Sequence, residues 1–305
     1  MHLWIDTDCG VDDSTAILLC LDHPNIDIVG ISCIGGNVSC EQVTKNVRRT
    51  IKVYDSKLSI PIFQGCERGL VSEPMHVPFI HGNDGLGDID LDSFGICDIP
   101  PIMTENSVFA LIKAIREYPD LTILTLGPLT NLALAIRIDP GIIPLISSLY
   151  IMGGAEDCVG NMTPYAEFNF VCDPESAHIV FSSVPKSRIT LSTWTLTKTH
   201  GLKGEILQEI FHKDTSKLQR WMAATWSNVI KYDENQALMA DPIAAFLAIN
   251  GKDAIEETEP MDVQIVLNGE KRGATLCTPI KDGVNIVKRI NFGLFTEAIQ
   301  KLFKH

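Results

Sequence analysis

Four carboxylates fall within eight residues near the start of the chain, in Asp6-Thr7-Asp8-Cys9-Gly10-Val11-Asp12-Asp13. They directly follow the apolar run Leu3-Trp4-Ile5, which is typical of a strand. Acids this close together repel one another unless a cation or a set of hydrogen-bond donors compensates them. Carboxylate oxygens suit hard cations such as Ca²⁺ or Mg²⁺, and this stretch lacks the His and Cys set of a zinc site. The pattern therefore predicts a cation site at the carboxyl end of a strand, where open α/β sheets bind ligands.

Two other interpretations of this stretch stay open from its residues alone. Asp12 and Asp13 could serve only to stabilise the positive N-terminal end of an amphipathic helix, which the pattern predicts over Ser14–Leu21. The Asp-x-Asp spacing is also that of a phosphohydrolase pattern, in which Asp6 would be the nucleophile and Asp8 the acid. The rest of the chain has to decide among the three.

Composition restricts the class of protein. The 305 residues are 45% hydrophobic, enough for a sizeable core, and carry a formal net charge of -13. This charge argues against a nucleic acid or an anionic membrane as partner and favours a small neutral or cationic ligand, or a metal. The nine cysteines form no Cys-x-x-Cys pair, which indicates reduced thiols. There is no leader and no apolar run of roughly 20 residues, so we expect a cytoplasmic protein without a membrane span.

The elements that must position the acids alternate between strand-like and helix-like patterns, as in a mostly parallel sheet flanked by helices. We therefore expect a single, Rossmann-like α/β domain over residues 1–305, with a long active-site loop near 65–100 and a helical lid region near 194–240. Strands are expected over Leu3–Ile5, Ile26–Ile34, Ile60–Phe63, Leu121–Leu126, Ser148–Met152, Arg188–Ser192, Val263–Leu267 and Asn285–Lys288. Helices are expected over Ser14–Leu21, Glu41–Tyr54, Asn106–Glu117, Leu129–Ile136, Pro174–Phe181 and Phe292–Phe303.

Further polar groups recur where these elements end. The segments that contain them are Gly35-Gly36-Asn37, His81-Gly82-Asn83-Asp84-Gly85-Leu86-Gly87, Gly127-Pro128-Leu129-Thr130-Asn131, Gly160 to Asp173, and Met239-Ala240-Asp241. Each has an ordinary explanation when taken alone: a turn, an exposed loop histidine, or a half-buried strand in which Glu167 and Asn169 alternate with Phe168 and Phe170.

Taken together, these segments resemble the motifs of the inosine-uridine preferring nucleoside hydrolase family, in that family's order, from Asp6 to Asp241. Cys9 stands where the family usually has proline. The resemblance implies the nucleoside hydrolase fold and a calcium cofactor, and neither the Gly160 to Asp173 block nor Asp241 is explained by a phosphohydrolase.

The resemblance also implies roles for individual residues. Calcium would be held by Asp8, Asp13, Asp241 and the backbone carbonyl of Leu126, and Asp8 would also be the general base for a water that attacks the anomeric carbon. The ribose would be bound by Asp12, Asn37, Asn161, Glu167 and Asn169, with Met152 packed nearby. His81 would contact or protonate the base, and Trp226 and Tyr232 would lie in the lid region over it.

One departure from the family concerns the leaving group. Many members carry a histidine immediately before the last calcium ligand, and this chain has Ala240. We therefore expect hydrolysis of ribonucleosides to base and ribose with a lean to purines. Two alternatives remain: broad or pyrimidine preference with a substitute acid such as His81 or Tyr232, and a non-catalytic, calcium-dependent nucleoside-binding protein. The resemblance also suggests a homodimer or homotetramer.

Overall fold

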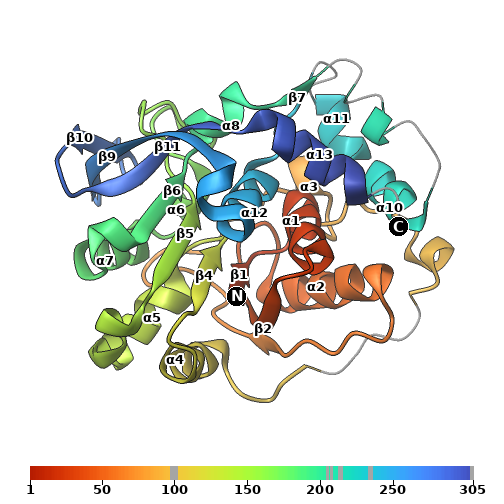
Figure 1. The fold of residues 1–305 in the computed structure, drawn as a ribbon, viewed down its shortest axis with the longest axis horizontal. Helices are drawn as coiled ribbons and strands as arrows, with labels where there is room; N and C mark the ends of the chain where they lie inside the picture. The colour runs from red at the N-terminus through yellow and green to blue at the C-terminus, as the bar shows by residue number, and fades with distance from the viewer. Residues whose placement is uncertain (97–101, 204–205, 207–208, 212–215, 233–235, 303–305) are drawn as a thin grey trace.

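A nine-stranded sheet runs through the centre of the computed structural model, which describes residues 1–96, 102–203, 206, 209–211, 216–232 and 236–302. The strand order is β10-β9-β11-β6-β5-β4-β1-β2-β3, and pairing is parallel from β3 through to β11 (Figure 1). The pairs β11–β9 and β9–β10 are antiparallel. A second small sheet joins β7 (Leu202–Lys203) to β8 (Gln236–Ala237).

The strands of the large sheet are β1 (His2–Thr7), β2 (Asp27–Cys33), β3 (Ile62–Gln64), β4 (Thr122–Thr125), β5 (Ser148–Met152), β6 (Ile189–Ser192), β9 (Ile255–Ile265), β10 (Thr275–Pro279) and β11 (Val284–Ile290). Strands β1, β4 and β5 consist mostly of apolar or buried residues, because helices cover both faces of the sheet there.

Helices form a layer on each side of this sheet (Figure 1). One layer contains α1 (Val11–Asp22), α2 (Cys40–Tyr54), α12 (Ala240–Asn250) and α13 (Phe292–Leu302). The other contains α4 (Ser107–Glu117), α5 (Thr130–Ile138) and α7 (Pro174–Ser183). Shorter helices lie in the connections: α3 (Pro78–His81), α6 (Phe168–Cys172), α8 (Trp194–Thr199), α10 (Lys217–Thr225) and α11 (Ser227–Tyr232).

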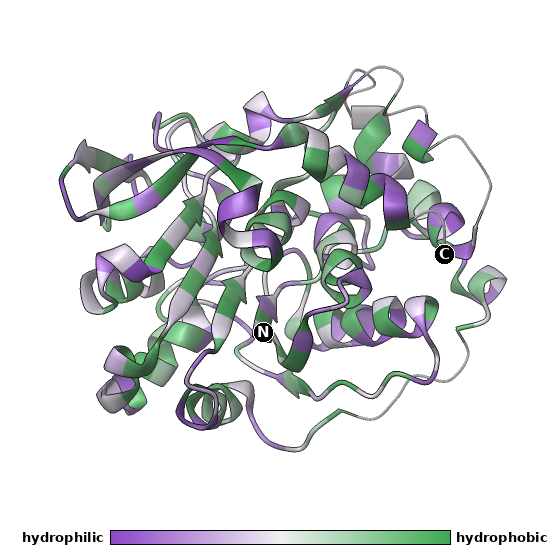
Figure 2. Ribbon diagram, in the orientation of Figure 1, coloured by the Kyte–Doolittle hydropathy of each residue, from purple (hydrophilic) through white to green (hydrophobic). Residues whose placement is uncertain are grey.

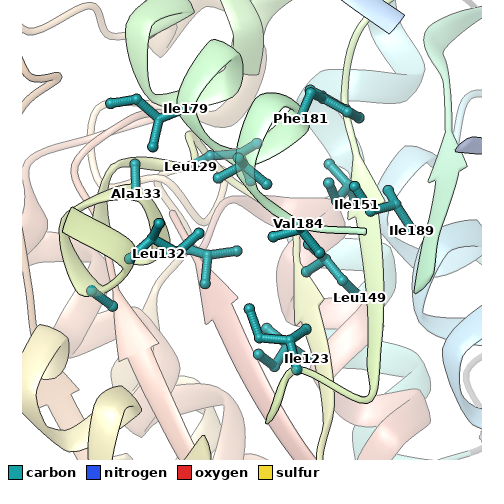
Figure 3. Packing of buried hydrophobic residues seen from close by; sticks show 14 of the residues in the cluster. Ile123, Leu129, Leu132, Ala133, Leu149, Ile151, Ile179, Phe181, Val184 and Ile189 are labelled. Carbon is teal, nitrogen blue, oxygen red and sulfur yellow. The ribbon is translucent and has the colours of Figure 1, made fainter. Parts of the chain in front are cut away.

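The core between the sheet and the helices α5 and α7 is made of apolar, mostly aliphatic side chains that pack together. Figure 3 shows strand residues opposite helix-side residues: Ile123, Leu149, Ile151 and Ile189 against Leu129, Leu132, Ala133, Ile179, Phe181 and Val184. Burying a side chain of this size stabilises the fold by roughly 1.5–3 kcal/mol. The outer helices α2 and α13 alternate hydrophobic and hydrophilic residues, as Figure 2 shows, so each has one face toward the core.

The expected fold class is confirmed, and most expected elements occur within a few residues of their predicted bounds. Three findings differ from the sequence analysis or decide an alternative that it left open. Helix α1 begins at Val11 rather than Ser14, so Asp12 and Asp13 belong to its first turn. Residues from Phe168 form the helix α6, with Glu167 capping its N-terminus, so the half-buried strand that was the ordinary explanation of this segment is excluded. Strand β10 was not expected, since its exposed edge position leaves little apolar pattern.

The long loop over 65–100 contains the short helix α3 and a 3₁₀ turn over Leu91–Phe94, and its last residues, 97–100, lie outside the described part of the chain, as does Phe303. Among the described residues no helix is long and apolar enough to cross a bilayer.

Candidate active site

The strand order reverses between β1 and β4, because β2 and β3 follow on one side of β1 while β5 and β6 follow on the other side of β4. Loops leaving β1 and β4 therefore diverge, and a crevice opens at the carboxyl ends of these two strands. A cavity of about 350 Å³ lies there, which is the size of a small-molecule site.

Most of the residues predicted to form the site meet in this cavity. Its lining includes Asp8, Asp12, Asn37, His81, Leu126, Met152, Asn161, Glu167, Asn169, Trp226 and Asp241. Asp13 is fully buried and adjoins the cavity through its neighbours in the acid cluster. Tyr232 is the last residue of α11, and its side chain lies outside the described residues.

The acids form a compact cluster that three elements build. Carboxylate oxygens of Asp12, Asp13 and Asp241 lie within 4.8 Å of one another, which is the spacing of a potential metal site. Asp12 and Asp13 come from the first turn of α1 and Asp241 from the first turn of α12. Asp8 follows β1 and lies beside them, where burial and then the charge of Asp13 raise the pKa of its carboxyl. Burial and the charge of Asp12 likewise raise the pKa of Asp241.

Hydrogen-bond donors compensate this cluster only in part. Asp13 accepts from Thr7 Oγ1 at 2.5 Å, Gly10 N–H at 2.8 Å and Asn37 Nδ2 at 3.2 Å. Asp8 Oδ2 accepts from the backbone N–H of Asn37 at 2.9 Å. Asp12 Oδ1 is buried and has no hydrogen-bond partner among the described residues. An all-oxygen set with unused lone pairs and no positive side chain fits a hard divalent cation.

The amides around the cavity are oriented by their other hydrogen bonds. Asn169 Nδ2 donates to the carbonyls of Leu126 at 2.7 Å and Met152 at 3.2 Å, so its Oδ1 is left for a ligand. Asn161 Oδ1 accepts from Phe168 N–H at 2.9 Å, which leaves its NH₂ group as a donor. Because Asn37 uses its NH₂ group on Asp13, its Oδ1 is an acceptor. The cavity thus presents amide donors and acceptors that suit a polyhydroxylated ligand.

Glu167 is held in place by the backbone at the start of α6. Its Oε1 accepts from Asn169 N–H at 2.9 Å, and its Oε2 accepts from Gly154 N–H at 2.8 Å and Phe170 N–H at 3.2 Å. Burial raises the pKa of Glu167 to about 7 in spite of these three donors. A buried carboxyl with remaining lone pairs can accept a hydrogen bond from a hydroxyl group.

His81 reaches the cavity from the end of α3, and its Nδ1 accepts from the backbone N–H of Val11 at 3.2 Å. The proton of the ring is therefore on Nε2. Burial lowers the pKa of His81 to about 4, so the ring is neutral at neutral pH. A neutral imidazole can donate a hydrogen bond to a base, but it is a poor source of a proton for a leaving group.

Gly10 makes room for this arrangement. A Cβ atom at Gly10 would lie 2.8 Å from Nδ1 of His81 and 2.7 Å from Nδ2 of Asn37. Both side chains would have to move if Gly10 carried a side chain.

Most of the remaining lining residues are apolar, and apart from Ala240 none of them was predicted from the sequence to lie at the site. They include Val77, Phe79, Ile80, Met162, Phe168, Trp194, Val229, Gln236, Leu238 and Ala240. Single apolar residues in a sequence look like ordinary core residues, so no pattern marked them as a wall. Phe79 differs from a core residue because it is 62% exposed at the rim of the cavity.

Trp226 lines the cavity but is itself completely buried, and its indole N–H donates to Thr15 Oγ1 at 3.0 Å. Trp221 makes a similar bond to Ser14 Oγ at 3.2 Å. These bonds attach α10 and its C-cap residue Trp226 to helix α1.

Asp6 does not line the cavity, which contradicts its role as a phosphohydrolase nucleophile. Its Oδ2 accepts from Ser32 Oγ and from Asn131 Nδ2, and burial raises its pKa to about 7. Asn131 also donates to the carbonyl of Cys33 and accepts from Cys66 N–H at 3.0 Å. The pair therefore connects β1 to the start of the long loop.

A crevice at the reversal of a parallel sheet, with a cluster of acids that could hold a metal beside oriented amides, is typical of a small-molecule site in an α/β enzyme. A family model described as inosine-uridine preferring nucleoside hydrolase matches residues 3–297. The chain belongs to this family, and the resemblance noted in its motifs is confirmed.

Individual relatives differ in the substrates that their names give. Uridine nucleosidase 1 of Arabidopsis thaliana is 39% identical over 186 residues, which cover 59% of this chain and 53% of the plant protein. The chain thus spans about half the length of that relative. The inosine-uridine preferring nucleoside hydrolase of Crithidia fasciculata is 30% identical over 266 residues, covering 86% of this chain and 82% of the relative. The solved structure of a purine-preferring ribonucleoside hydrolase from Gardnerella vaginalis has a TM-score of 0.87 at 26% identity and covers 100% of this chain and 99% of its own.

Proposed function

We propose that this chain hydrolyses the N-glycosidic bond of ribonucleosides, releasing the free base and ribose. The observation that carries the proposal is the cavity itself, in which buried acids, oriented amides and an apolar wall meet in a volume of about 350 Å³. The polar lining residues suit a sugar, and the apolar lining residues suit a flat, largely apolar base. Family membership supports the same reaction.

Calcium is the cation that we propose for the acid cluster. Asp8, Asp13, Asp241 and the carbonyl oxygen of Leu126 would hold it. Asp13 and Asp241 belong, together with Asp12, to the cluster described above, and one lone pair of the Leu126 carbonyl already accepts from Asn169. When bound, calcium would offset the repulsion among the acids and lower the pKa of water in the site.

Asp8 is the proposed general base. Its Oδ2 is engaged by Asn37, so Oδ1 is left to take the proton of the attacking water. The water oxygen forms a bond to the anomeric carbon while the carbon–nitrogen bond breaks. Positive charge that develops on the sugar in this step is stabilised by the nearby carboxylates of Asp12 and Glu167.

The ribose would be recognised by its hydroxyl groups. The NH₂ group of Asn161 would donate to one of them, while Oδ1 of Asn37 and Oδ1 of Asn169 would accept from others. A sugar that lacks a hydroxyl would leave buried groups without a partner, which lowers its affinity and its rate.

The base preference that we propose is a lean to purines. A purine can be protonated at N7 by solvent, whereas a pyrimidine leaves poorly without a positioned acid. Ala240, which lines the cavity, offers no proton, and the hydrogen bond from Val11 N–H to Nδ1 of His81 argues against a protonated imidazole at His81.

The test is release of reducing sugar from inosine, adenosine, guanosine, uridine and cytidine, with and without a calcium chelator. We expect turnover of the purine nucleosides that is lost on chelation and restored by added Ca²⁺. Equal turnover of uridine would contradict the purine lean, and binding of nucleosides without any release of sugar would contradict hydrolysis.

A further inference from the structure

We infer that Arg272, which does not line the cavity, is a positioning residue for the sugar-binding side chains of Glu167 and Asn169. The inference rests on the proposed hydrolysis of ribonucleosides and adds a residue to its machinery. Three observations carry it: how little the helix α6 can do to fix its own place, what the connection between β9 and β10 contacts, and which segments the guanidinium group of Arg272 joins.

Helix α6 carries sugar-binding groups but is too short to fix its own place. It has five residues, Phe168–Cys172, with Glu167 as its N-cap and Asn169 in its first turn. Isolated helices of this length are unstable in water, so tertiary contacts must hold α6. One of its core contacts is Phe170, which is completely buried and lies edge-to-face with Phe181 at 5.7 Å between ring centroids. The place of Glu167 and Asn169 therefore depends on what packs around this helix.

The hairpin tip, residues 266–274 between β9 and β10, packs against α6 and against the chain that precedes it. A Cβ atom at Gly273 would lie only 2.9 Å from Cα of Val171 in α6. The ammonium group of Lys271 lies over the ring of Tyr165, 5.1 Å from its centroid. The hairpin tip thus touches the chain both before α6 and within it.

Arg272 lies between these two contacts and joins the hairpin tip to two further segments. Its Nη1 and Nη2 donate to Oε1 and Oε2 of Glu175 at 2.6 and 2.7 Å, a bidentate ion pair with the first turn of α7. Nη1 also donates to the carbonyl of Leu267 at 2.6 Å, and Nη2 to Ser72 Oγ of the long loop at 3.2 Å. One side chain thus connects the hairpin tip, the long loop and α7, along which β9 also packs (Figure 1).

This ion pair is well placed to hold its partners in one arrangement. The side chains of Arg272 and Glu175 are 32% and 25% exposed, so solvent screens the pair less than it screens a fully exposed one. The planar guanidinium fork matches the two carboxylate oxygens, which a lysine ammonium group cannot do. Arg272 therefore fixes an orientation as well as a distance.

Helix α7 does not need the ion pair in order to form. Its N-cap Asp173 accepts from Ser176 N–H at 3.1 Å, and Pro174 follows at the first helical position. Glu175 lies near the positive end of the helix dipole, where an acid is favourable by itself. Only Asp173 separates α7 from α6. Loss of the guanidinium group should therefore leave α7 folded but free its start, and with it α6, from the hairpin tip.

The experiment measures discrimination among sugars. The substrates are whichever of inosine, adenosine and uridine the wild type hydrolyses fastest in the presence of Ca²⁺, together with the 2′-, 3′- and 5′-deoxy analogues of that nucleoside. A site with well-placed groups rejects an analogue that lacks a bound hydroxyl group. Asn169→Ala identifies the hydroxyl group that Asn169 binds, because this variant should no longer discriminate against the matching analogue.

We expect Arg272→Met to lower kcat/KM for the ribonucleoside about tenfold, since small misplacements of positioning groups are costly. It should also reduce the discrimination against the same analogue that Asn169→Ala identifies. The matched control is Arg289→Met, because Arg289 pairs with Glu256 and Glu257 at 2.7 and 2.8 Å and does not line the cavity. This control should change neither quantity.

Two further variants test the ion pair itself. Glu175→Gln removes the charge of the partner at nearly constant size, and it replaces Arg272→Met in the test should the latter not fold. We expect it to reproduce both effects, and the double variant to lose no more than either single variant, because the two side chains act as a unit. Arg272→Lys keeps the charge without the bidentate bond, so its loss should be smaller than that of Arg272→Met.

Unchanged discrimination in Arg272→Met, whatever its melting temperature, would overturn the inference and leave the hydrolase proposal standing. Additive losses in the double variant, or equal kinetics of Arg272→Met and Arg289→Met, would also overturn it. Failure of the wild type to release sugar from any nucleoside would instead overturn the proposed function itself.

Discussion

Asp8 occupies a position in which almost nothing but a small, buried carboxylate fits. It is 1% exposed, and a Cβ atom at Gly36 would lie 2.2 Å from its Oδ2, while one at Gly127 would lie 2.9 Å from its Oδ1. The two glycines and the N–H of Asn37 therefore fix the carboxylate without using all of its lone pairs. A group held in this way can take a proton with little rearrangement.

Replacing Asp8 tests its role as base. Asp8→Asn keeps the shape and the bond to Asn37 but removes the basic oxygen, so we expect kcat to fall about 10³-fold or more. The melting temperature of cation-free protein should stay the same or rise, because one of the repelling acids is gone. Steady-state kinetics and thermal unfolding check both outcomes, with Asp8→Ala as a second variant. Activity near that of the wild type would refute the assignment.

Gly10 offers a test of the base and sugar contacts that leaves their own side chains unchanged. Gly10→Ala should displace His81 and Asn37 and lower kcat/KM about tenfold or more, since small misplacements of positioning groups are costly. Gly293→Ala in α13 is the matched control, because its nearest contact would be an ordinary 3.7 Å. If the two variants had equal kinetics, the contacts of Gly10 would be irrelevant to the site.

At the scale of elements, the motif regions were predictable and the apolar wall was not. The acids after β1 carry their own chemistry, and the alternation of strand and helix patterns places them at a sheet edge. The N-terminal cap that Glu167 provides for α6 was missed, because its alternation with aromatic residues imitates a strand. Phe79, Trp194 and Leu238 come from three separate segments, and only tertiary packing brings them together.

Helix α10 is attached to α1 by the indole hydrogen bonds of Trp221 and of its C-cap residue Trp226, so Trp226 has a structural role besides lining the cavity. Trp226→Phe removes the donor to Thr15 and leaves a buried hydroxyl short of one partner. We expect it to lower the free energy of unfolding by about 1–2 kcal/mol, measured by urea denaturation. Trp194→Phe is the control, because the indole N–H of Trp194 has no hydrogen-bond partner among the described residues. Equal losses in the two variants would show that the bond to Thr15 contributes nothing.

At the scale of the whole molecule, buried acids make stability depend on pH and on a cation. The pKa of Asp6 and that of Glu167 are raised to about 7, and that of Asp12 to about 6, in each case by burial. The unfolded chain loses the protons of these carboxyl groups at about pH 4. The folded state therefore binds more protons than the unfolded state between about pH 4 and pH 7. The free energy of unfolding must then fall as pH rises, by up to about 1.4 kcal/mol per pH unit and group. The pKa of His81 is lowered to about 4, so between about pH 4 and its ordinary pKa this residue makes the free energy of unfolding rise with pH. This is the contribution of one group, whereas several acids make the free energy of unfolding fall.

We therefore expect protein treated with a chelator to melt at a lower temperature at about pH 7.5 than at about pH 5. Added Ca²⁺ should raise the melting temperature far more at about pH 7.5 than at about pH 5, because at the higher pH the buried acids are charged and have no other counter-charge among the described residues. A cation that binds only the folded state at 100 times its Kd adds about 2.7 kcal/mol. Differential scanning calorimetry at both pH values, with and without Ca²⁺, measures the effect. Asp241→Asn is the informative variant, because removing one acid of the cluster should reduce both the pH dependence without cation and the response to Ca²⁺. A chelated protein as stable at pH 7.5 as at pH 5, and indifferent to Ca²⁺, would mean that these acids are compensated by the hydrogen bonds of the chain alone.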